Sequence, residues 1–252
     1  MEEGYSAVMK KICNVLLCLI ILLCTCSCGV YRNPNTISDL AYDRSGKAES
    51  VYILENDQYI PFLVLTDDYN GKTLLLRKDL LTEKRSISDY SSYYGDSLID
   101  LYLNNEYIKC LTELSEYIVS SDIEITADDA LGTVGVETEQ INRKIFLLSC
   151  QETGFDDGVN ISPEGEMLEY FENPDNRVAY SEGEVSSWWL RTPDTSYFSC
   201  SYVIGDNNKL GFSNAYDKNG IRPAFCVRND MEIEQSGSIV VGQNVYIFSL
   251  EN

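Results

Sequence analysis

The sequence has no histidine among its 252 residues. Histidine is the general base of Ser-His-Asp and Cys-His catalytic sites, and it is a frequent zinc ligand. Its absence excludes these nucleophilic sites and every histidine-ligated metal centre. Any enzyme built from this chain has to use carboxylate, cysteine, tyrosine, lysine or arginine side chains.

Basic residues are scarce. The chain has 19 lysines and arginines against 40 aspartates and glutamates, a formal net charge of -21 at pH 7. Proteins that bind nucleic acid by neutralising phosphates carry basic surfaces, and anionic membranes also attract basic segments. We therefore expect no nucleic-acid partner and no electrostatic attachment to a membrane surface.

Long hydrophobic runs are lacking apart from one near the amino terminus. Residues 12–23 are predominantly apolar, and Lys10 and Lys11 precede them. A positive start, a short apolar run and small residues before a cysteine are typical of a signal peptide. A transmembrane anchor is the alternative, but the run is short for a helix that needs about 20 apolar residues.

The end of this segment resembles a bacterial lipobox, in which a cysteine is lipidated after cleavage. Cys28 lies between Ser27 and Gly29, which fits that pattern, and Cys26 is the alternative. Two acyl chains on one residue anchor a protein stably. We expect an extracytoplasmic protein held at the cell membrane by a lipid anchor on Cys28.

The composition divides the chain into four segments. A polar stretch with Asn-Pro-Asn and Ser-Gly-Lys follows the leader and predicts a flexible tether. The rest has the length of one domain with a short extension. The expected segments are a lipoprotein signal peptide (1–28), a tether (29–50), a folded domain (51–230) and a C-terminal strand extension (231–252).

Five of the nine cysteines lie in the leader. Four cysteines can form disulfides in three ways, and sequence alone cannot choose among them. Four unbridged, buried thiols are an equal alternative. The cysteines concerned are Cys110, Cys150, Cys200 and Cys226.

The folded segment is expected to combine antiparallel strands with two short helices. Residues 67–71 (Asp-Asp-Tyr-Asn-Gly) predict a hairpin turn. Apolar stripes predict helices over 96–103 and 112–119. We interpret the acid-rich stretch 120–139 as a solvated loop. The expected strands cover 51–54, 60–66, 73–77, 144–149, 197–204, 209–212 and 221–227.

Both tryptophans lie in the block from Ser186 to Val227. Adjacent residues of a strand point to opposite faces, so consecutive tryptophans need cover on both sides. Arginines within such apolar runs need bidentate partners, for which carboxylates are suited. We expect a structural core with buried arginine pairs, a ligand site being the alternative. Its residues are Trp188, Trp189, Arg191, Gly220, Arg222 and Pro223.

Two motifs of this block carry a resemblance. Residues 186–193 read Ser-Ser-Trp-Trp-Leu-Arg-Thr-Pro, and residues 220–225 read Gly-Ile-Arg-Pro-Ala-Phe. They resemble the Trp-Trp-Leu-Arg-Ser-Pro and Gly-Val-Arg-Pro-Ala-Leu motifs of a family of bacterial extracellular domains of unknown function. Residues 97–104 are similar to that family's helix, with Asp100 and Tyr102 as departures. The resemblance covers roughly residues 45–228.

That family is distantly similar to the formylglycine-generating-enzyme (sulfatase-modifying-factor) and C-type-lectin-like fold. The resemblance implies an α+β domain with twisted antiparallel sheets, two short helices and long loops. Such a likeness of fold does not carry function with it.

The lectin-like fold and the 18 tyrosines favour a non-catalytic binding domain for a glycan or protein ligand. One alternative is an oxidase like the formylglycine-generating enzyme, which the resemblance would require to carry a close pair of reactive cysteines. Cys200 has no second cysteine within a few residues. A purely structural envelope protein is the other alternative.

One acidic segment could hold calcium, which prefers carboxylate, amide and carbonyl oxygens. It is similar to the Glu-Pro-Asn motif of calcium-dependent lectins, with one residue inserted before Pro174. Residues 156–157 could add ligands, and 206–208 form a weaker candidate. The alternative is an ordinary solvated acidic surface. The candidate ligands are Glu172, Asn173, Asp175 and Asn176, and we expect no other cofactor.

Overall fold

The computed structural model describes residues 34–44, 48–155, 160–240 and 242–250. The expected signal peptide, Cys28 and residues 156–157 lie outside this range. The described residues belong to one compact unit, Pro34–Asn252.

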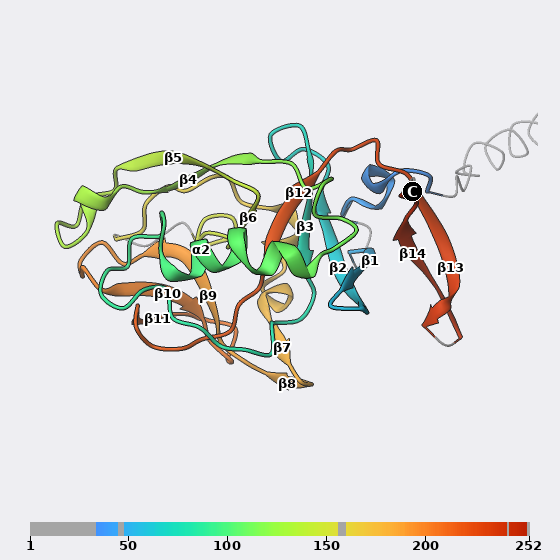
Figure 1. Cartoon of the computed structure of the whole chain (residues 1–252). Coiled ribbons are helices and arrows are strands. Elements are labelled where there is room, and N and C mark those ends of the chain that lie inside the picture. The colour runs from blue at the N-terminus through green and yellow to red at the C-terminus, as the bar shows by residue number, and fades with distance from the viewer. Residues whose placement is uncertain (1–33, 45–47, 156–159, 241, 251–252) are drawn as a thin grey trace, which may run out of the picture. The chain divides into compact units, whose positions relative to one another are not determined.

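The main element of this unit is an open mixed sheet of seven strands in the order β13-β14-β1-β2-β3-β12-β6 (Figure 1). Neighbouring strands are antiparallel, except that β1 and β14 run parallel. The strands are β1 (Ser50–Glu55), β2 (Gln58–Thr66), β3 (Thr73–Arg77), β6 (Ile145–Phe146), β12 (Ala224–Val227), β13 (Ile233–Val240) and β14 (Gln243–Phe248).

Three smaller sheets complete the β-structure of the described residues. β9 (Trp188–Pro193), β10 (Cys200–Ile204) and β11 (Leu210–Asn214) form an antiparallel sheet in the order β11-β10-β9. The other two are hairpins. They consist of β4 (Ser121–Thr126) with β5 (Thr138–Arg143), and of β7 (Tyr180–Ser181) with β8 (Glu184–Val185).

The β4–β5 hairpin corrects our interpretation of residues 120–139 as a solvated loop. Ile123 and Ile125 are buried, whereas Asp122 between them is exposed. This alternation is the period of a strand with one face in the core. Asp122, Glu124 and Glu139 therefore lie on strands, whereas Asp128, Asp129 and Glu137 lie in the connection between them.

One expected helix is present and the other is not. α2 (Leu98–Asn105) begins at Ser97, whose Oγ accepts a hydrogen bond from the Asp100 N–H at 3.3 Å. The helix expected over 112–119 is wrong, because residues 112–117 form successive turns. Val119 then donates its N–H to Cys226 O at 2.9 Å, so pairing with β12 draws the chain out of a helical path.

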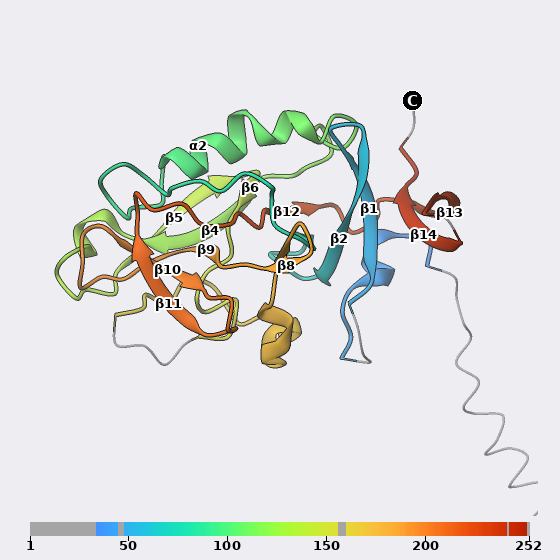
Figure 2. The same ribbon diagram turned by 90° about the horizontal axis from the view of Figure 1, so that it is seen from below.

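Short 3-10 turns account for the remaining regular structure of the described chain, which is α+β with little helix (Figure 2). They are η1 (Ile37–Leu40), η2 (Tyr107–Cys110), η3 (Asp128–Ala130), η4 (Glu169–Glu172) and η5 (Pro174–Arg177). No helix of the described residues is long and apolar enough to cross a membrane.

Part of the expected tether is packed onto the domain. Ile37 and Leu40 of η1 are buried, and Thr36 forms a β-bridge with Glu232. The described part of the range 29–50 therefore differs from a free linker. Apolar side chains in that polar stretch provide the contact.

The tryptophans of β9 connect two hydrophobic clusters. Trp189 belongs to the main core, and Trp188 packs with Leu80, Leu190 and Ile204 in a smaller cluster. β9 lies at the edge of its sheet, yet all six of its residues are buried. Loop backbone covers its free edge, since Arg191 N donates to Leu148 O and Trp189 N donates to Gly220 O.

Candidate functional site

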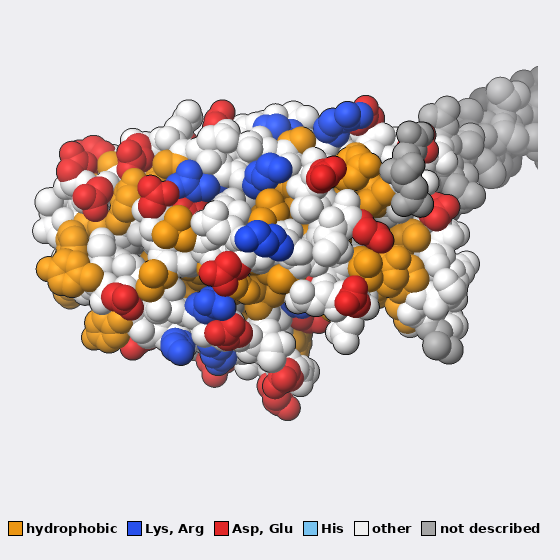
Figure 3. Space-filling view, in the orientation of Figure 1, with side chains coloured by type: hydrophobic (Ala, Val, Ile, Leu, Met, Phe, Trp, Pro, Cys, Tyr) orange, Lys and Arg blue, Asp and Glu red, His pale blue; other side chains and the backbone are white. Residues whose placement is uncertain are grey.

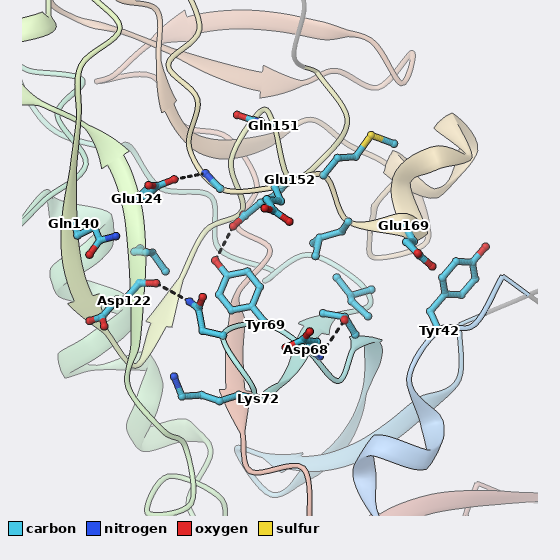
Figure 4. A pocket seen from close by; sticks show the side chains of 18 residues that line it. Tyr42, Asp68, Tyr69, Lys72, Asp122, Glu124, Gln140, Gln151, Glu152 and Glu169 are labelled. Carbon is cyan, nitrogen blue, oxygen red and sulfur yellow. Dashed lines mark hydrogen bonds between the residues drawn. The ribbon is translucent and has the colours of Figure 1, made fainter.

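A groove of about 1060 Å³ opens beside the turn that joins β2 and β3 (Figure 4). Its walls come from that turn, from β4 and β5, and from residues 165–169. Lys72 is the one basic side chain among the described residues that line it. The carboxylates that line it are Asp68, Asp122, Glu124, Glu152, Glu166 and Glu169.

Hydrogen bonds hold the walls of this acidic groove together. Asn70 Nδ2 donates to Asp122 O at 3.0 Å, which ties the β2–β3 turn to β4. Glu124 Oε2 accepts from Gly165 N at 2.9 Å, which ties β4 to the opposite wall. Hydrogen bonds between side chains and backbone therefore link the walls to one another.

The floor of the groove is a buried network around Glu152. Its two oxygens accept from Arg191 Nη1 and Nη2 at 2.7 and 3.0 Å, and Tyr69 donates its hydroxyl to Oε1 at 2.6 Å. Burial, followed by the nearby Glu152 charge, raises the pKa of Tyr69 above its usual range. Tyr69 thus stays a protonated hydrogen-bond donor at the base of the groove.

Arg191 is buried and has a partner for each of its N–H groups. It also donates to the carbonyl oxygens of Glu124 and Leu147, both at 2.9 Å, and of Glu164 at 3.4 Å. Burial alone would lower the pKa of Arg191, but Glu152 raises it above the ordinary value. The guanidinium is therefore charged and structural.

A second buried carboxylate, Glu164, lies 3.6 Å from Arg191 Nε. It accepts hydrogen bonds from Thr126 N and Oγ1 and from Thr192 Oγ1, each at 2.7 Å. Burial raises the pKa of Glu164 even though Arg191 acts in the opposite direction. The single positive charge of Arg191 is thus shared between two buried carboxylates, Glu152 and Glu164, and does not balance both.

Arg222 is also buried but differs in its partners. It donates to Arg77 O at 3.0 Å and Lys78 O at 3.1 Å, and its guanidinium lies 5.2 Å from the Trp188 ring centroid. Its Nη1 has no hydrogen-bond partner among the described residues. Burial lowers the pKa of Arg222 to about 10. Its hydrogen bonds run to carbonyl oxygens, whereas those of Arg191 include a carboxylate.

Gly220 and Pro223 flank Arg222 at the approach to β12. A Cβ on Gly220 would lie 2.7 Å from Ser187 O and would also meet the Leu80 side chain. Pro223 O accepts from Arg77 N at 2.9 Å, and β12 begins one residue later. Proline has no N–H to donate, so Pro223 takes part in the contact with β3 only through its carbonyl oxygen, as an acceptor.

Three of the four side chains proposed to bind calcium have other partners, and the fourth, Asp175, is exposed. Glu172 accepts from Arg44 at 2.9 Å, and Asn173 Oδ1 caps η5 by accepting from Asp175 N at 3.1 Å. Asn176 Nδ2 donates to Tyr170 O at 2.6 Å. Within the described residues, no group of three or more carboxylate and cysteine side chains is arranged to hold a metal ion.

The four cysteines outside the leader are free thiols. Cys150, Cys200 and Cys226 are buried, and burial raises the pKa of each, in the case of Cys226 to about 12. A thiolate is the nucleophilic form of cysteine, so these groups are poorly suited to attack a substrate.

The acidic groove and the buried arginines lie in a domain whose family can be assigned. Residues 70–229 match the family described as domain of unknown function DUF6273. The match spans more than half of the chain, and the chain belongs to this family. No match was found among curated proteins or among solved structures.

The matched region begins at residue 70 and leaves out β1 and β2. The resemblance found in the sequence began at about residue 45 and included these two strands. It contains Trp188, Arg191 and Arg222 together with the acidic partners Glu152 and Glu164. Sequence reasoning did not single out those two acids, because they lie in a stretch rich in other carboxylates. Their burial is the property that separates them.

Proposed function

We propose that this chain is a cell-surface lipoprotein whose domain binds a glycan or protein ligand in the acidic groove without chemical change. A lipid on Cys28 would hold it on the extracytoplasmic side of the cell membrane. The observation that carries the binding proposal is the groove itself, whose walls are linked by hydrogen bonds and whose floor is a buried network. A preorganised site avoids the cost of ordering its side chains when the ligand arrives.

The chemistry of the walls favours a polar, extended ligand. Sites for apolar small molecules are lined mostly by hydrophobic side chains. This groove instead presents carboxylates, the amides of Asn70, Gln140 and Gln151, and the Tyr42 side chain. Such groups accept hydrogen bonds from sugar hydroxyls and from the N–H groups of peptides.

The cysteines do not support the oxidase alternative. Cys150, Cys200 and Cys226 are buried and unbridged, and their raised pKa keeps the thiols protonated. We therefore propose that the protein is not an enzyme.

We also propose that the fold is akin to the C-type-lectin-like and formylglycine-generating-enzyme fold. Support comes from the β-bridge between Trp188 and Gly220, which brings the two motifs of the resemblance together. An experimental structure with a different course of the chain between these motifs would contradict this kinship.

Binding can be tested with the full-length chain in detergent, applied to arrays of glycans and of synthetic peptides. The double variant Asp122→Asn, Glu166→Gln removes two exposed charges from the groove and keeps the side-chain shapes. Glu113→Gln, Glu116→Gln removes two exposed charges elsewhere and serves as the matched control.

We expect the groove variant to lose about tenfold or more in affinity for the ligand found, because charged hydrogen bonds at binding sites are worth about 1.5–3 kcal/mol. Equal losses in both double variants would contradict a site in the groove. No binding to either array would contradict the binding function.

The anchor is tested separately by mass spectrometry of the mature amino terminus. We expect a diacylated cysteine at position 28 and loss of the preceding residues. A mature chain that retains residues 10–23 would contradict the lipoprotein assignment, and acylation at position 26 would move the site to Cys26.

A further inference from the structure

Five large aromatic side chains are exposed on one part of the domain, away from the acidic groove. Their exposed fractions range from 42% to 76%. Exposed apolar side chains that gather into a patch, instead of lying singly, mark interaction surfaces. The residues are Tyr90, Tyr197, Phe198, Phe212 and Tyr216, and we refer to them as the aromatic surface.

Two ring contacts pair four of these residues, and the pairs meet at the adjacent positions Tyr197 and Phe198. The Tyr90 and Phe198 rings meet edge to face with centroids 5.4 Å apart, and Tyr197 stacks on Phe212 at 6.4 Å. Tyr216 follows Ala215, which donates its N–H to Ser199 O at 2.7 Å.

Backbone hydrogen bonds hold the three supporting segments. Ser92 N donates to Phe198 O at 3.0 Å, and Ser88 N donates to Ala215 O at 3.1 Å. The rings are therefore carried by a fixed scaffold, although they lie in loops and on β11.

The tip of the β4–β5 hairpin borders this surface. Val134 N donates to Thr195 O at 3.1 Å, and Val134 and Val136 are 61% and 47% exposed. The hairpin tip thus adds apolar area beside Tyr197 and Phe198. It also brings the exposed acids Asp128, Asp129 and Glu137 to the border.

Acidic side chains outnumber basic side chains in and around this region. The segments that supply the aromatic surface and its border contain no lysine or arginine, although the exposed Lys209 and Lys218 flank the last of them. The segments are 86–95, 127–137, 194–199 and 210–217. In Figure 3, orange and red side chains gather at the left end of the molecule, and the basic side chains shown lie farther toward the middle. None of these segments contributes to the acidic groove.

We propose that the aromatic surface docks a protein partner that presents a face rich in arginine and lysine. Tyrosine and phenylalanine are enriched at protein interfaces, and arginine is enriched with them. Cations are attracted to aromatic faces, and the bordering carboxylates add charge complementarity and faster association. This proposal concerns a second surface and does not depend on a ligand in the groove.

The test uses the full-length chain in detergent and three probes. They are a short arginine-rich synthetic peptide, the same peptide with glutamate in place of arginine, and a neutral oligosaccharide. Binding is measured by fluorescence anisotropy, and hydrogen exchange locates the protected segments. Thermal melts confirm that each variant is folded.

The central variant is Tyr90→Ser, Tyr197→Ser, Phe212→Ser, which removes exposed rings without changing charge. Tyr59→Ser, Tyr180→Ser removes two tyrosines that are 40% and 44% exposed elsewhere, and it is the matched control. Asp122→Asn, Glu166→Gln reports on attachment to the groove. Asp128→Asn, Asp129→Asn removes charge from the border alone.

We expect the arginine-rich peptide to bind and the glutamate peptide not to bind. The triple variant should lose about tenfold or more in affinity, as ring removal does at interface hot spots, while the control and groove variants keep the parent affinity. The border variant should lose affinity mainly at low salt, because exposed charges are screened as the salt concentration rises.

Three results would overturn the proposal. One is an arginine-rich peptide that does not bind or that binds the triple variant as tightly as the parent. Another is loss of peptide binding in the groove variant alone. The third is protection of residues 194–199 and 210–217 by the oligosaccharide but not by the peptide, which would make the surface a glycan site.

Discussion

Arg191 and Glu152 form a bidentate ion pair in which both side chains are completely buried. The pair lies between the core strand β9 and the floor of the acidic groove. Its partners Tyr69 and Ser149 extend it to the β2–β3 turn and to the chain after β6. The stability of the domain and the shape of the groove therefore depend on the same few side chains.

Replacing Arg191 with methionine should be strongly destabilising. The change leaves Glu152 and Glu164 buried without a cation, and breaking one partner of a buried pair costs about 3–5 kcal/mol. Denaturant unfolding measures the loss. Arg228→Met is the control, because Arg228 pairs with Asp230 on the exposed surface, where we expect no measurable change. Equal stability of the two variants would contradict a central role for the buried pair.

Replacing Glu164 with glutamine should change how stability depends on pH. The pKa of Glu164 is raised in the folded protein, so the folded state binds its proton more tightly than the unfolded state does. The stabilisation from this group is present below its unfolded value of about 4.5 and is lost as the pH rises through the folded pKa. Unfolding free energies of both proteins from pH 4 to pH 7 test this.

Relative to the parent, the glutamine variant should gain stability on going from pH 4 to pH 7, because it carries no charge to bury. Glu166→Gln, an exposed position, is the control and should follow the parent. A parent and a Glu164→Gln variant that differ by the same amount at every pH would contradict the raised pKa.

Replacing Gly220 with alanine should destabilise the domain through a steric clash. The added methyl would lie 2.7 Å from Ser187 O, which is backbone and cannot move aside easily. Overpacking of this kind costs about 1–3 kcal/mol. Gly211→Ala is the matched control, since its methyl would lie 3.8 Å from Val203, an ordinary contact. Thermal melts in which the control loses as much stability would contradict the clash.

Calcium should leave the stability of the protein unchanged. The candidate side chains Glu172 and Asn173 are engaged by Arg44 and by the backbone of η5, and Asp175 adds one exposed carboxylate. We expect superimposable thermal melts in chelator and in excess calcium. A ligand that binds the folded state raises stability by about 2.7 kcal/mol at a hundredfold excess over its Kd. A calcium-dependent rise in melting temperature that Asp175→Ala abolishes would contradict this prediction and support a calcium site.

Local signals in the sequence identified several elements well. The turn expected at 67–71 corresponds to the loop before β3, and the strand expected over 73–77 is β3 (Thr73–Arg77). The helix expected over 96–103 corresponds to α2, because Ser97 supplies a capping hydroxyl at its start. Turn chemistry and capping act within a few residues, so they can be recognised without knowledge of the fold.

The missed features depend on contacts between distant residues. The β4–β5 hairpin was not predicted from the sequence, because the many acids on its exposed face outnumber the apolar residues that mark a strand. The expected helix over 112–119 is absent because Val119 pairs with Cys226, which lies more than a hundred positions farther along the chain. Glu152 became a candidate only when its burial beside Arg191 was seen, since any of the 40 acids could have filled that role.

The parallel pairing of β1 with β14 has a consequence for biosynthesis. Val51 and Tyr52 lie opposite Tyr246 and Ile247, so β1 meets its outer neighbour only after residues 243–248 have been made. Until then β1 presents an unpaired edge, which is the part of a sheet that other chains can join. A chain that lacks β13 and β14 is thus prone to intermolecular association. The β13–β14 hairpin therefore protects an edge of β1, which precedes it by most of the described chain.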